Sequence, residues 1–492
     1  MRIRVLSRGS DLATLQARLV ATALRARWPA LDVSLATQSS EGDRDRRIAL
    51  WDATEKGLFT TDLSQALVDH HADLVVHSWK DLPIEPYPGT TIAGTLERAD
   101  ARDVLLLRRD VVEARPASLT VLTSSPRRMW QIERSLAPLL PWAIATISTT
   151  AVRGNIPTRL AKLVAGEAHG LVVAKAALDR LLSPDATPQI AAAVRTAIEE
   201  CRWMVLPLRE FPTAPAQGAL AIEAAADATE VRELVGAIDH APTRRAVDDE
   251  RGILAEAGGG CHEAIGASVR VRDYGTVTSV RGRMPNGQER EVWSLRAEGN
   301  VWPRVAEASI WPRRDERDCG TRHPMVGARV PADSTALWIA RADAVPEGFV
   351  QGDGQIVWAS GSRTWEKLAR RGIWVHGSAE GLGDSEEPTL DVLANAKVQW
   401  LRVTHADSGD PSALATYTVE RPLPDDLDRR THFFWTSGSL FLRALERYPA
   451  IRVHRHASGP GRTSQVIRET LGPSPDARVW LDYDQWLQNV IR

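Results

Sequence analysis

Short apolar runs and longer stretches with apolar residues at helical spacing follow one another from the N-terminus onwards. Runs of four to eight apolar residues fit buried strands, whereas a repeat of three to four residues fits helices. Strands that alternate with helices predict an α/β fold with parallel sheets. Strands are expected at 4–7, 31–37, 74–76, 104–107, 121–122, 171–174 and 219–222, and helices at 12–27, 61–68, 176–182 and 248–257.

The stretch 72–83 places charged side chains directly after one of these strands, because it reads Ala-Asp-Leu-Val-Val-His-Ser-Trp-Lys-Asp-Leu-Pro. Ser78, Lys80 and Asp81 follow the apolar run before a proline ends the pattern. Open α/β sheets bind ligands beyond the carboxyl ends of their strands. A lone Lys-Asp pair is more often a solvated turn, so the meaning of this pair depends on the rest of the chain.

Three other turns that follow predicted strands are rich in arginine and hydroxyl groups. Helix N-termini, hydroxyls and guanidinium groups together bind carboxylates or phosphates. A single such turn usually carries only a solvated charge, but several of them favour a polyanionic ligand. Their side chains are Arg8 and Ser10, then Thr123, Ser125, Arg127 and Arg128, and then Arg153 and Arg159.

A cysteine follows three glycines in the sequence Gly258-Gly259-Gly260-Cys261-His262, after the helix expected at 248–257. A thiol on a glycine turn is accessible for covalent chemistry, whereas a buried cysteine is usually inert packing. A zinc site is disfavoured because no second Cys/His pair lies at ligand spacing. No metal is therefore expected. The three cysteines are far apart and odd in number, which is typical of a reducing cytoplasm.

Composition narrows the class of protein further. A chain of 492 residues with 25% charged and 43% hydrophobic residues fits a soluble protein of about two to four domains. The net charge of -2 gives no global field that would recruit nucleic acid. No apolar stretch approaches the roughly 20 residues that cross a bilayer, and the N-terminus enters a strand pattern without a signal peptide. We expect a cytoplasmic monomer that binds neither membranes nor nucleic acid.

Taken in order, the motifs between residues 4 and 266 resemble the porphobilinogen deaminase family, also called hydroxymethylbilane synthase. The motifs are Ser-Arg-Gly-Ser, Lys-Gly-Leu-Phe, Val-His-Ser-Trp-Lys-Asp-Leu-Pro, Thr-Ser-Ser-Pro-Arg-Arg, Arg-Gly-Asn-Ile-Pro-Thr-Arg-Leu, Gln-Gly-Ala and Gly-Gly-Cys. The chain departs from the family at Leu122, at Pro126, at Pro215-Ala216 and in the loop 38–43. None of these departures removes a charged group on which the family's mechanism depends.

The resemblance implies two doubly wound domains like those of periplasmic binding proteins, with the site in the cleft between them, and a small α+β domain. It implies that Cys261 holds a covalent dipyrromethane cofactor and that Asp81 is the catalytic acid/base. The growing product is a polycarboxylate, which explains the arginines. The implied cofactor contacts are Ser78, Lys80, Asp81, Thr123, Ser125, Arg127 and Arg128, and the implied substrate contacts are Arg8, Ser10, Arg153, Arg159 and Gln217.

The last third of the chain restarts as α/β after a strand-rich stretch, 268–297, with an Asn286-Gly287 hairpin signal. Two blocks share the plan of strand, Ser-Gly-Ser turn, helix, strand and glycine turn, which suggests an internal duplication. Their strands are expected at 336–341, 355–359, 373–375, 432–435 and 451–454.

This compact α/β region resembles uroporphyrinogen-III synthase, which closes the linear tetrapyrrole while inverting its last ring. The resemblance rests on short motifs, and it makes Tyr417, Ser437 and Thr463 candidates for substrate contacts. The region is shorter than is usual for that family. The alternative is an inactive appendage on a deaminase.

The expected domains are therefore 1–225 for the two deaminase lobes, 226–312 for the domain with the cysteine, 313–334 for a linker and 335–492 for the synthase-like region. A two-lobed anion-binding protein is a further alternative. That class predicts a secretion signal and needs no cysteine on a glycine turn, whereas this chain has the cysteine and lacks the signal.

Overall fold

The computed structural model describes residues 1–38, 60–258, 264–297, 302–317, 320–383, 388–472, 474 and 476–492. The chain forms two compact units. None of the described helices combines the length and the apolar character needed to cross a membrane. The first unit holds Met1–Ala137, Ile144–Val271 and Thr278–Trp293, and the second holds Pro138–Ala143, Arg272–Val277 and Ser294–Arg492.

The first unit contains two five-stranded sheets with the same design, in the orders β2-β1-β3-β10-β4 and β7-β6-β8-β5-β9. In each sheet the first three strands are parallel and the fourth is antiparallel to its neighbours. The strands are β1 (Arg2–Arg8), β2 (Asp32–Gln38), β3 (Leu74–Ser78), β4 (Thr90–Gly94), β5 (Asp103–Arg108), β6 (Ser118–Leu122), β7 (Thr146–Thr150), β8 (Gly170–Ala174), β9 (Cys201–Val205) and β10 (Leu220–Ala225). The mixed α/β fold expected from the sequence is confirmed.

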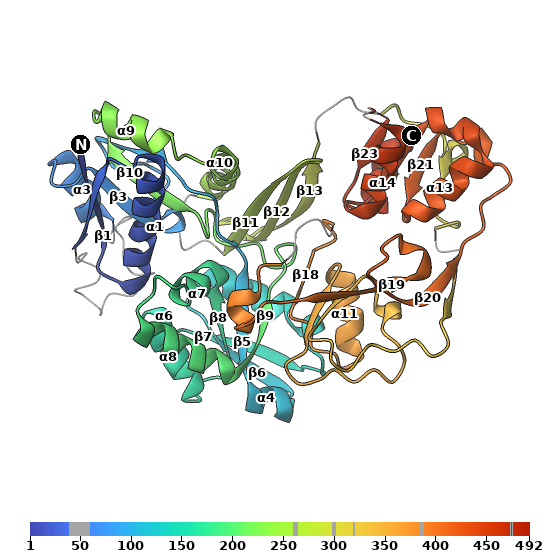
Figure 1. The fold of residues 1–492 in the computed structure, drawn as a ribbon, viewed down its shortest axis with the longest axis horizontal. Coiled ribbons are helices and arrows are strands. Elements are labelled where there is room, and N and C mark those ends of the chain that lie inside the picture. The colour runs from blue at the N-terminus through green and yellow to red at the C-terminus, as the bar shows by residue number, and fades with distance from the viewer. Residues whose placement is uncertain are drawn as a thin grey trace. The chain divides into compact units, whose positions relative to one another are not determined.

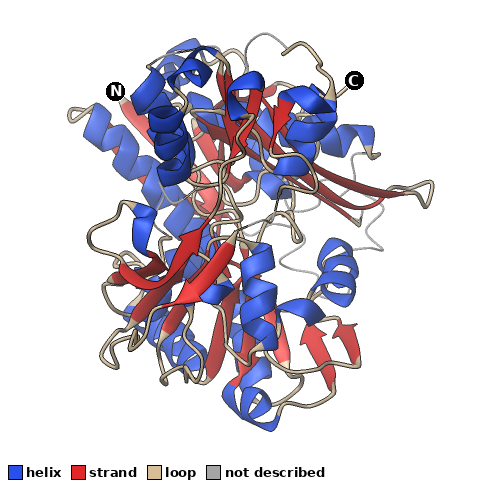
Figure 2. Ribbon diagram, turned by 90° about the vertical axis from the view of Figure 1, so that its right-hand side faces the viewer, coloured by secondary structure: helices blue, strands red, loops and turns tan. Residues whose placement is uncertain are grey.

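Helices pack on the faces of these sheets (Figure 2). The helix α1 (Asp11–Arg27) buries Val20, Ala21 and Leu24 against Ile3 and Val5 of β1, because its apolar positions recur at helical spacing. Figure 1 shows this helix beside β1 and β3. The other helices of the two lobes are α3 (Thr61–Val68), α4 (Arg109–Ala114), α5 (Pro126–Ser135), α6 (Ile156–Val164), α7 (Lys175–Leu181), α8 (Pro188–Glu199) and α9 (Thr229–Gly236).

The chain crosses between the two sheets twice, since β10 returns to the first sheet after β5 to β9 have built the second. The segments 95–102 and 206–219 make these two crossings. Because β10 then pairs with β3, Lys80, which follows β3, lies next to Gln217, which precedes β10.

A helix and a three-stranded sheet complete the first unit. The helix α10 (Ala241–Glu256) begins seven residues earlier than expected, because His240 accepts the Thr243 N–H at its start and Pro242 occupies the first turn. The sheet has the order β11-β12-β13 (Figure 1). The Asn286-Gly287 signal is confirmed, since it forms the tight turn between β12 and β13. The strands are β11 (Ile265–Arg272), β12 (Gly275–Arg283) and β13 (Glu289–Arg296).

The second unit also contains two sheets with parallel strands, in the orders β14-β21-β22-β23 and β15-β20-β19-β16-β17-β18. The strands are β14 (Ile310–Trp311), β15 (Thr321–Pro324), β16 (Ala336–Ile339), β17 (Ile356–Ala359), β18 (Gly377–Ser378), β19 (Trp400–His405), β20 (Leu414–Glu420), β21 (His432–Trp435), β22 (Arg455–Ser458) and β23 (Ala477–Val479). The helices are α11 (Ser362–Arg370), α12 (Asp391–Ala394), α13 (Gly438–Arg447), α14 (Arg462–Leu471) and α15 (Tyr483–Val490).

The boundaries of this region differ from those expected. The strand β14 lies before residue 313, yet it pairs with β21 of the last sheet. The stretch 313–334, expected to be a linker, contains β15, which pairs antiparallel with β20. The two sequence blocks are thus not two independent repeats, because the segment before the first block completes the sheet of the second.

Two expected strands of this region are wrong. The apolar run 373–375 forms no strand, and the run 451–454 lies mostly in the short helix η7 (Pro449–Val453). Ile373, Val375 and Ile451 are buried all the same. Their apolar side chains fill the core beside a helix end, while the strands β18 and β22 begin a few residues later. At these positions the apolar residues therefore correctly predict that the side chains are buried, but they do not predict the conformation of the backbone.

Candidate functional site

The stretch 72–83 contains β3, the central strand of the first sheet, and continues past the carboxyl end of that strand. The strand β3 is buried, and a single helical turn, η1 (Trp79–Asp81), follows it. Pairing with β10 continues past the strand end, since the Trp79 N–H donates to the Ala219 carbonyl. Trp79 is buried, Lys80 is half-buried and Asp81 is exposed. The buried indole of Trp79 therefore anchors the turn, while the amine of Lys80 and the carboxylate of Asp81 remain available to a ligand.

A buried carboxylate, Asp103, joins the residues that the sequence placed in separate motifs. Its oxygens accept from Arg127 Nη2 at 3.0 Å and from Arg128 Nη2 at 2.6 Å. Gln217 Nε2 donates to the same carboxylate at 2.8 Å, and Gln217 Oε1 lies 3.5 Å from Lys80 Nζ. The chain of contacts runs from Lys80 through Gln217 and Asp103 to both arginines, so the two sheets contribute to one polar cluster.

Charge pairing determines the ionisation of this cluster. Burial alone would raise the pKa of Asp103, but Arg128, Arg127 and the Gln217 hydrogen bond hold it well below its usual range. Burial lowers the pKa of Lys80, and Arg128 and Arg127 add to this, while Asp81 and Asp103 oppose it. An amine in this position is easily discharged unless an anion joins it. The three cations around Asp103 outnumber this carboxylate, so a bound carboxylate would add a favourable charge.

Side chains cap the two helices that start beside this cluster. Ser125 accepts the Arg128 N–H at the start of α5, and Asn155 accepts the Thr158 N–H at the start of α6. Ser124 ties the two turns together, because its hydroxyl donates to the Val152 carbonyl at 2.6 Å and accepts the Val152 N–H at 2.9 Å. The turn with Arg127 and Arg128 and the turn with Arg153 and Arg159 are thus fixed to each other.

Two further guanidinium groups are desolvated near this point. Burial lowers the pKa of Arg159, and the Arg128 charge lowers it further. Burial lowers the pKa of Arg180 to about 10 against the opposing charge of Asp179. Arg180 Nη2 donates to the Gly218 carbonyl at 2.8 Å, one residue from Gln217. Desolvated arginines whose pKa values fall are positioned to gain from an anionic ligand.

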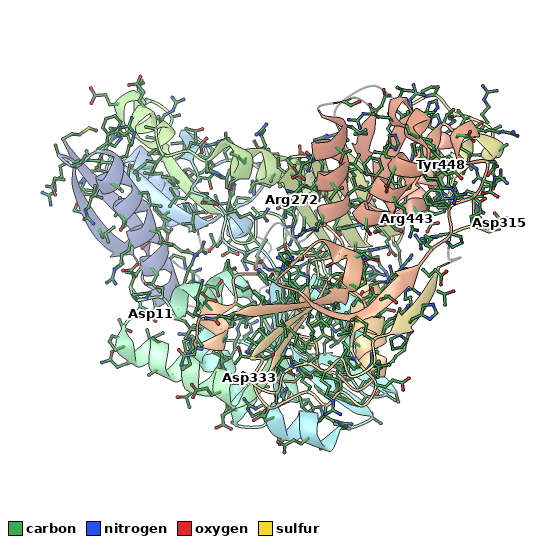
Figure 3. The ribbon with its side chains drawn as sticks, turned by 45° about the vertical axis from the view of Figure 1, so that its right-hand side comes forward. Asp11, Arg272, Asp315, Asp333, Arg443 and Tyr448 are labelled. Atoms are coloured by element: carbon green, nitrogen blue, oxygen red, sulfur yellow. The ribbon has the colours of Figure 1, made fainter. Side chains whose placement is uncertain are left out.

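Two more of the predicted residues lie where β1 leads into α1, Arg8 at the end of the strand and Ser10 at the start of the helix. Ser10 caps the helix by accepting the Ala13 N–H at 3.3 Å. Farther along, Gln16 Nε2 donates to Ser78 Oγ at 2.8 Å, which connects α1 to the end of β3. Figure 3 marks the start of this helix by Asp11. The same helix contacts α7, and Arg18 donates to the Asp185 carbonyl beyond α7.

The structure thus joins some predicted residues directly and leaves others at the ends of neighbouring elements. Lys80, Gln217, Arg127 and Arg128 meet through Asp103, and Arg159 interacts with Arg128. Thr123 accepts the Ser125 N–H within the turn before α5. Arg8, Ser10 and Arg153 lie at the ends of β1 and β7, outside this hydrogen-bonded chain. Cys261 and the Lys-Gly-Leu-Phe motif at 56–59 lie outside the described residues.

Asp103, Arg180 and Gln16 are the polar residues that the sequence analysis missed. Asp103 stands at the start of a predicted strand in an Arg-Asp pair, which is a weak signal because such pairs are common on surfaces. Gln16 and Arg180 lie inside predicted helices, where a polar residue usually faces water. A polar turn after a predicted strand identified the residues that follow strands. It could not identify Gln16 and Arg180, which lie within helices.

The candidates of the second unit occupy three elements. Tyr417 is buried in β20, Ser437 caps α13 by accepting the Leu440 N–H, and Thr463 lies in the first turn of α14. Figure 3 shows Arg443 on α13, where it donates to the carbonyl of Arg421. The starts of α13 and α14 lie close together, since a side chain at Gly438 would meet Val466. Ser437 and Thr463 therefore lie at the starts of two neighbouring helices, α13 and α14.

Comparison with known proteins gives a consistent result for the first unit. The family described as porphobilinogen deaminase, dipyromethane cofactor binding domain, matches residues 3–233. Porphobilinogen deaminase of Syntrophomonas wolfei is 34% identical over 293 residues, which cover 59% of this chain and 88% of that protein. Porphobilinogen deaminase of Desulforudis audaxviator is 40% identical over 269 residues, 54% of this chain and 79% of that protein. About two fifths of the chain lie outside these alignments.

Proposed function

Because this chain belongs to the porphobilinogen deaminase family, we propose that it joins four porphobilinogen molecules head to tail into hydroxymethylbilane. In each step a carbon–nitrogen bond breaks and ammonia leaves. The freed methylene carbon bonds to the free α-carbon of the terminal pyrrole, which then loses its proton. Addition of water to the last methylene carbon releases the product. The cluster around Asp103 carries the proposal, since it gathers the cationic side chains that a polycarboxylate needs.

The residues of the site fit a dipyrromethane with its acetate and propionate groups. Lys80, Arg128, Arg159 and Arg180 are desolvated or half-buried cations at the ends of strands and helices. Arg127 is buried and held by Asp103 and the Pro212 carbonyl, so it is not counted among the ligand-binding cations, and Asp103 orients Arg128 through two further hydrogen bonds. When bound, the cofactor supplies the free α-carbon to which the first substrate is joined. We propose Cys261 as its point of attachment, with Ser78, Thr123 and Ser125 as hydroxyl donors.

Asp81 is the residue proposed to move protons. Its carboxylate is exposed at the end of the buried β3, next to the amine of Lys80. A carboxyl group in this position can protonate the leaving amine and accept the proton lost from the α-carbon. As a carboxylate it also stabilises the positive charge that develops when ammonia leaves. Lys80, Arg128 and the cationic turns hold the substrate carboxylates, so that Asp81 meets the reacting carbon.

The decisive experiment is incubation of the purified chain with porphobilinogen, with the intact mass measured first. We expect a mass that includes a dipyrromethane, a positive Ehrlich reaction and consumption of porphobilinogen. Cys261→Ser should lack both the added mass and the colour, whereas Cys201→Ser, at a buried cysteine elsewhere in the first unit, should keep them. Protein that carries the cofactor and yet consumes no porphobilinogen would refute the assignment, as would an Ehrlich-positive Cys261→Ser.

For the second unit we propose closure of hydroxymethylbilane to uroporphyrinogen III. The supporting observation is that the ends of its two sheets approach each other. A side chain at Gly383, after β18, would lie within 2.9 Å of Gly461, after β22. Arg462 donates across the same gap to the carbonyl of Gly409, after β19. Facing carboxyl ends of parallel strands are where α/β proteins bind ligands, and Ser437 and Thr463 lie at this boundary as proposed substrate contacts.

The isomer of the product separates the two proposals. Closure without inversion of the last ring gives uroporphyrinogen I, whereas a working second unit gives isomer III. Incubation with porphobilinogen alone, followed by oxidation and separation of the uroporphyrins, should yield mostly isomer III. Isomer I alone would show an active deaminase with an inactive second unit, and the cyclisation would then be abandoned.

A further inference from the structure

Three neighbouring strands of the six-stranded sheet end in a row of polar side chains in the second unit. In β19 and β20, His405 is the register partner of Tyr417. In β16 and β19, Ile339 is the partner of Val403, and the Ala340 N–H donates to the Val403 carbonyl at 3.1 Å. The same register places Arg341, two residues beyond Ile339, opposite His405. The row therefore runs Arg341, His405, Tyr417 across β16, β19 and β20.

Arg341 offers an exposed guanidinium group at one end of this row. Within the described part of the chain this guanidinium group makes no hydrogen bond, ion pair or ring contact. Asp343, two residues farther along the chain, lies 3.7 Å from Arg322 and is paired with that residue. Arg341 acts electrostatically on the row itself, because its charge lowers the pKa values of both His405 and Tyr417.

His405 is a neutral imidazole with one nitrogen occupied. Burial lowers its pKa, and Arg341 lowers it further, against the opposing charge of Asp407. Its Nδ1 lies 3.2 Å from the Thr404 hydroxyl. If that hydroxyl donates, Nδ1 is the acceptor, and the proton of the neutral ring is therefore on Nε2. Nε2–H is then a donor for which the described residues provide no acceptor.

Tyr417 packs its ring beside His405, with the ring centres 5.9 Å apart and the planes at 39°. Burial raises the pKa of its hydroxyl, so the phenol stays protonated, although Arg341 and Arg322 oppose this shift. Among the described residues the hydroxyl has no hydrogen-bond partner. The ring is buried, with the residue 3% exposed, whereas the hydroxyl is not among the buried polar atoms without a partner, so it stays accessible to a ligand. The row thus presents a guanidinium group, an imidazole N–H and a phenol O–H, all without an acceptor.

We propose that Arg341, His405 and Tyr417 form a subsite for one carboxylate, namely an acetate or propionate side chain of the linear tetrapyrrole. This inference rests on the proposed cyclisation, for which it names the anion-binding residues. A carboxylate has two oxygens in one plane, which suits the guanidinium fork and leaves lone pairs for the other two donors. The carboxylates of Asp343 and Asp407 nearby favour a monoanion over a doubly charged phosphate.

Four variants of the full chain test the subsite: Arg341→Met, Arg341→Lys, His405→Gln and Tyr417→Phe. The matched control is Arg370→Met, because Arg370 is an exposed arginine of the same unit but lies in the last turn of the helix α11. Hydroxymethylbilane is supplied directly, so the deaminase site does not limit the rate. Circular dichroism confirms that each variant is folded, and Tyr417→Phe keeps the buried ring if another variant fails.

Two quantities are measured. The first is KM and kcat for formation of isomer III, and the second is the dissociation constant of uroporphyrin III from its fluorescence. A lost charge-assisted hydrogen bond of about 1.5–3 kcal/mol corresponds to roughly 10- to 100-fold weaker binding. Arg341→Met should therefore weaken binding and raise KM at least tenfold. Arg341→Lys should recover part of the loss, and Arg370→Met should match the unmodified chain.

The two readouts separate this proposal from the cyclisation on which it rests. If the unmodified chain yields isomer I only, the cyclisation fails, and the binding of uroporphyrin III alone then decides the subsite. Weaker binding in Arg341→Met and Tyr417→Phe, but not in Arg370→Met, supports the subsite in either case. Equal dissociation constants and equal isomer III kinetics in Arg341→Met and Arg370→Met would overturn it.

Discussion

Asp81 and Lys80 are neighbours in the chain but differ in their exposure to water, and this difference bears on the roles proposed for them. Lys80 is half-buried and its pKa is lowered, so it binds an anion best when a carboxylate compensates its lost hydration. Asp81 is exposed and can exchange protons with substrate and solvent. The difference therefore supports the proposed acid/base role of Asp81 and the proposed binding role of Lys80.

Asp81→Asn should preserve the fold and the attached cofactor but reduce turnover of porphobilinogen by about 10²- to 10⁴-fold, the usual contribution of a general acid or base. The amide keeps the shape of the side chain but cannot transfer a proton. Initial rates and intact mass, measured on the same preparation, test this. Asp11→Asn, at the exposed first turn of α1, is the control. A rate for Asp81→Asn near that of the unmodified chain would contradict the assignment.

Ala216 is a second residue whose local geometry has a measurable consequence. It departs from the family motif, and its φ of 64° lies in the left-handed region, where a side chain is strained. Glu250 holds it there, since the Ala216 N–H donates to Glu250 Oε2 at 2.7 Å. Ala216→Gly should raise the free energy of unfolding by about 1 kcal/mol. Urea unfolding measures this change, and a loss of stability would show that the methyl packing outweighs the strain.

At the scale of elements, α10 holds both crossings to the third sheet through one side chain. Glu250 is fully buried and pairs with Arg98 of the first crossing through two bonds of 2.7 and 2.9 Å. It also accepts the N–H groups of Ala216, in the second crossing, and Val269, in β11. A single carboxylate thus fixes the segments about which the two lobes are connected.

Glu250→Gln should cost about 3–5 kcal/mol, because it leaves the Arg98 charge buried without its partner. The amide also turns an N–H group toward donors that need an acceptor. Hydrogen exchange of the amides in 95–102 and 215–219, together with the urea midpoint, measures the effect. Glu256→Gln on the same helix is the control, since its pair with Arg290 is exposed and contributes at most about 1 kcal/mol. Equal effects of the two variants would disprove the special role of Glu250.

The elements themselves were predicted well where strands and helices alternate at regular spacing. The helix α3 and the strand β21 have the expected bounds, whereas β3 continues two residues past the expected end at 76, through His77 and Ser78. Prediction failed at 373–375 and 451–454, because an apolar triplet after a helix can be buried without joining a sheet. It also missed β14 and β15, since pairing between segments about 100 residues apart leaves no local signal.

In the candidate site, too, some residues could be predicted from the sequence and others could not. Arg127, Arg128 and Lys80 were found because each follows a strand in a polar turn. Asp103 was missed although it joins them, because only the folded chain shows that its carboxylate is buried between two arginines. Arg341 and His405 were missed for a related reason. Each is a single polar residue at a strand end, and their relation depends on the order β16-β19-β20, which the sequence does not reveal.

At the scale of the whole molecule, the two units should differ in their response to acid. His432 and His456 lie in the last sheet of the second unit and are buried to 1% and 0% exposure. Burial lowers the pKa of each to about 4, and the positive charges nearby add to this. His456 is fully bonded in its neutral form, to Trp435 and to the Ile451 carbonyl. The native second unit therefore excludes two protons that its unfolded form accepts.

The sign of the pH effect follows from these values. Above pH 6.5, the ordinary value for histidine, both states are neutral and the stability is fully present. As the pH falls from 6.5 to about 4, the unfolded state takes up protons that the folded state refuses, so the free energy of unfolding decreases. Each histidine contributes a loss of about 3 kcal/mol over this window, at about 1.4 kcal/mol per pKa unit. Two such losses approach the total stability of a typical domain, so the second unit should unfold near pH 4.

His432→Phe tests this directly, because Nε2 of His432 is buried without a partner and an apolar ring loses little there. The variant should keep about 3 kcal/mol more of its stability between pH 6.5 and 4 than the unmodified chain, with little difference at pH 7.5. Hydrogen exchange, followed peptide by peptide, assigns the unfolding to the second unit. His323→Phe, at an exposed histidine of the same unit, should leave the acid transition in place. If both variants lose stability in parallel with the unmodified chain, carboxylate protonation and not the buried histidines controls the acid transition.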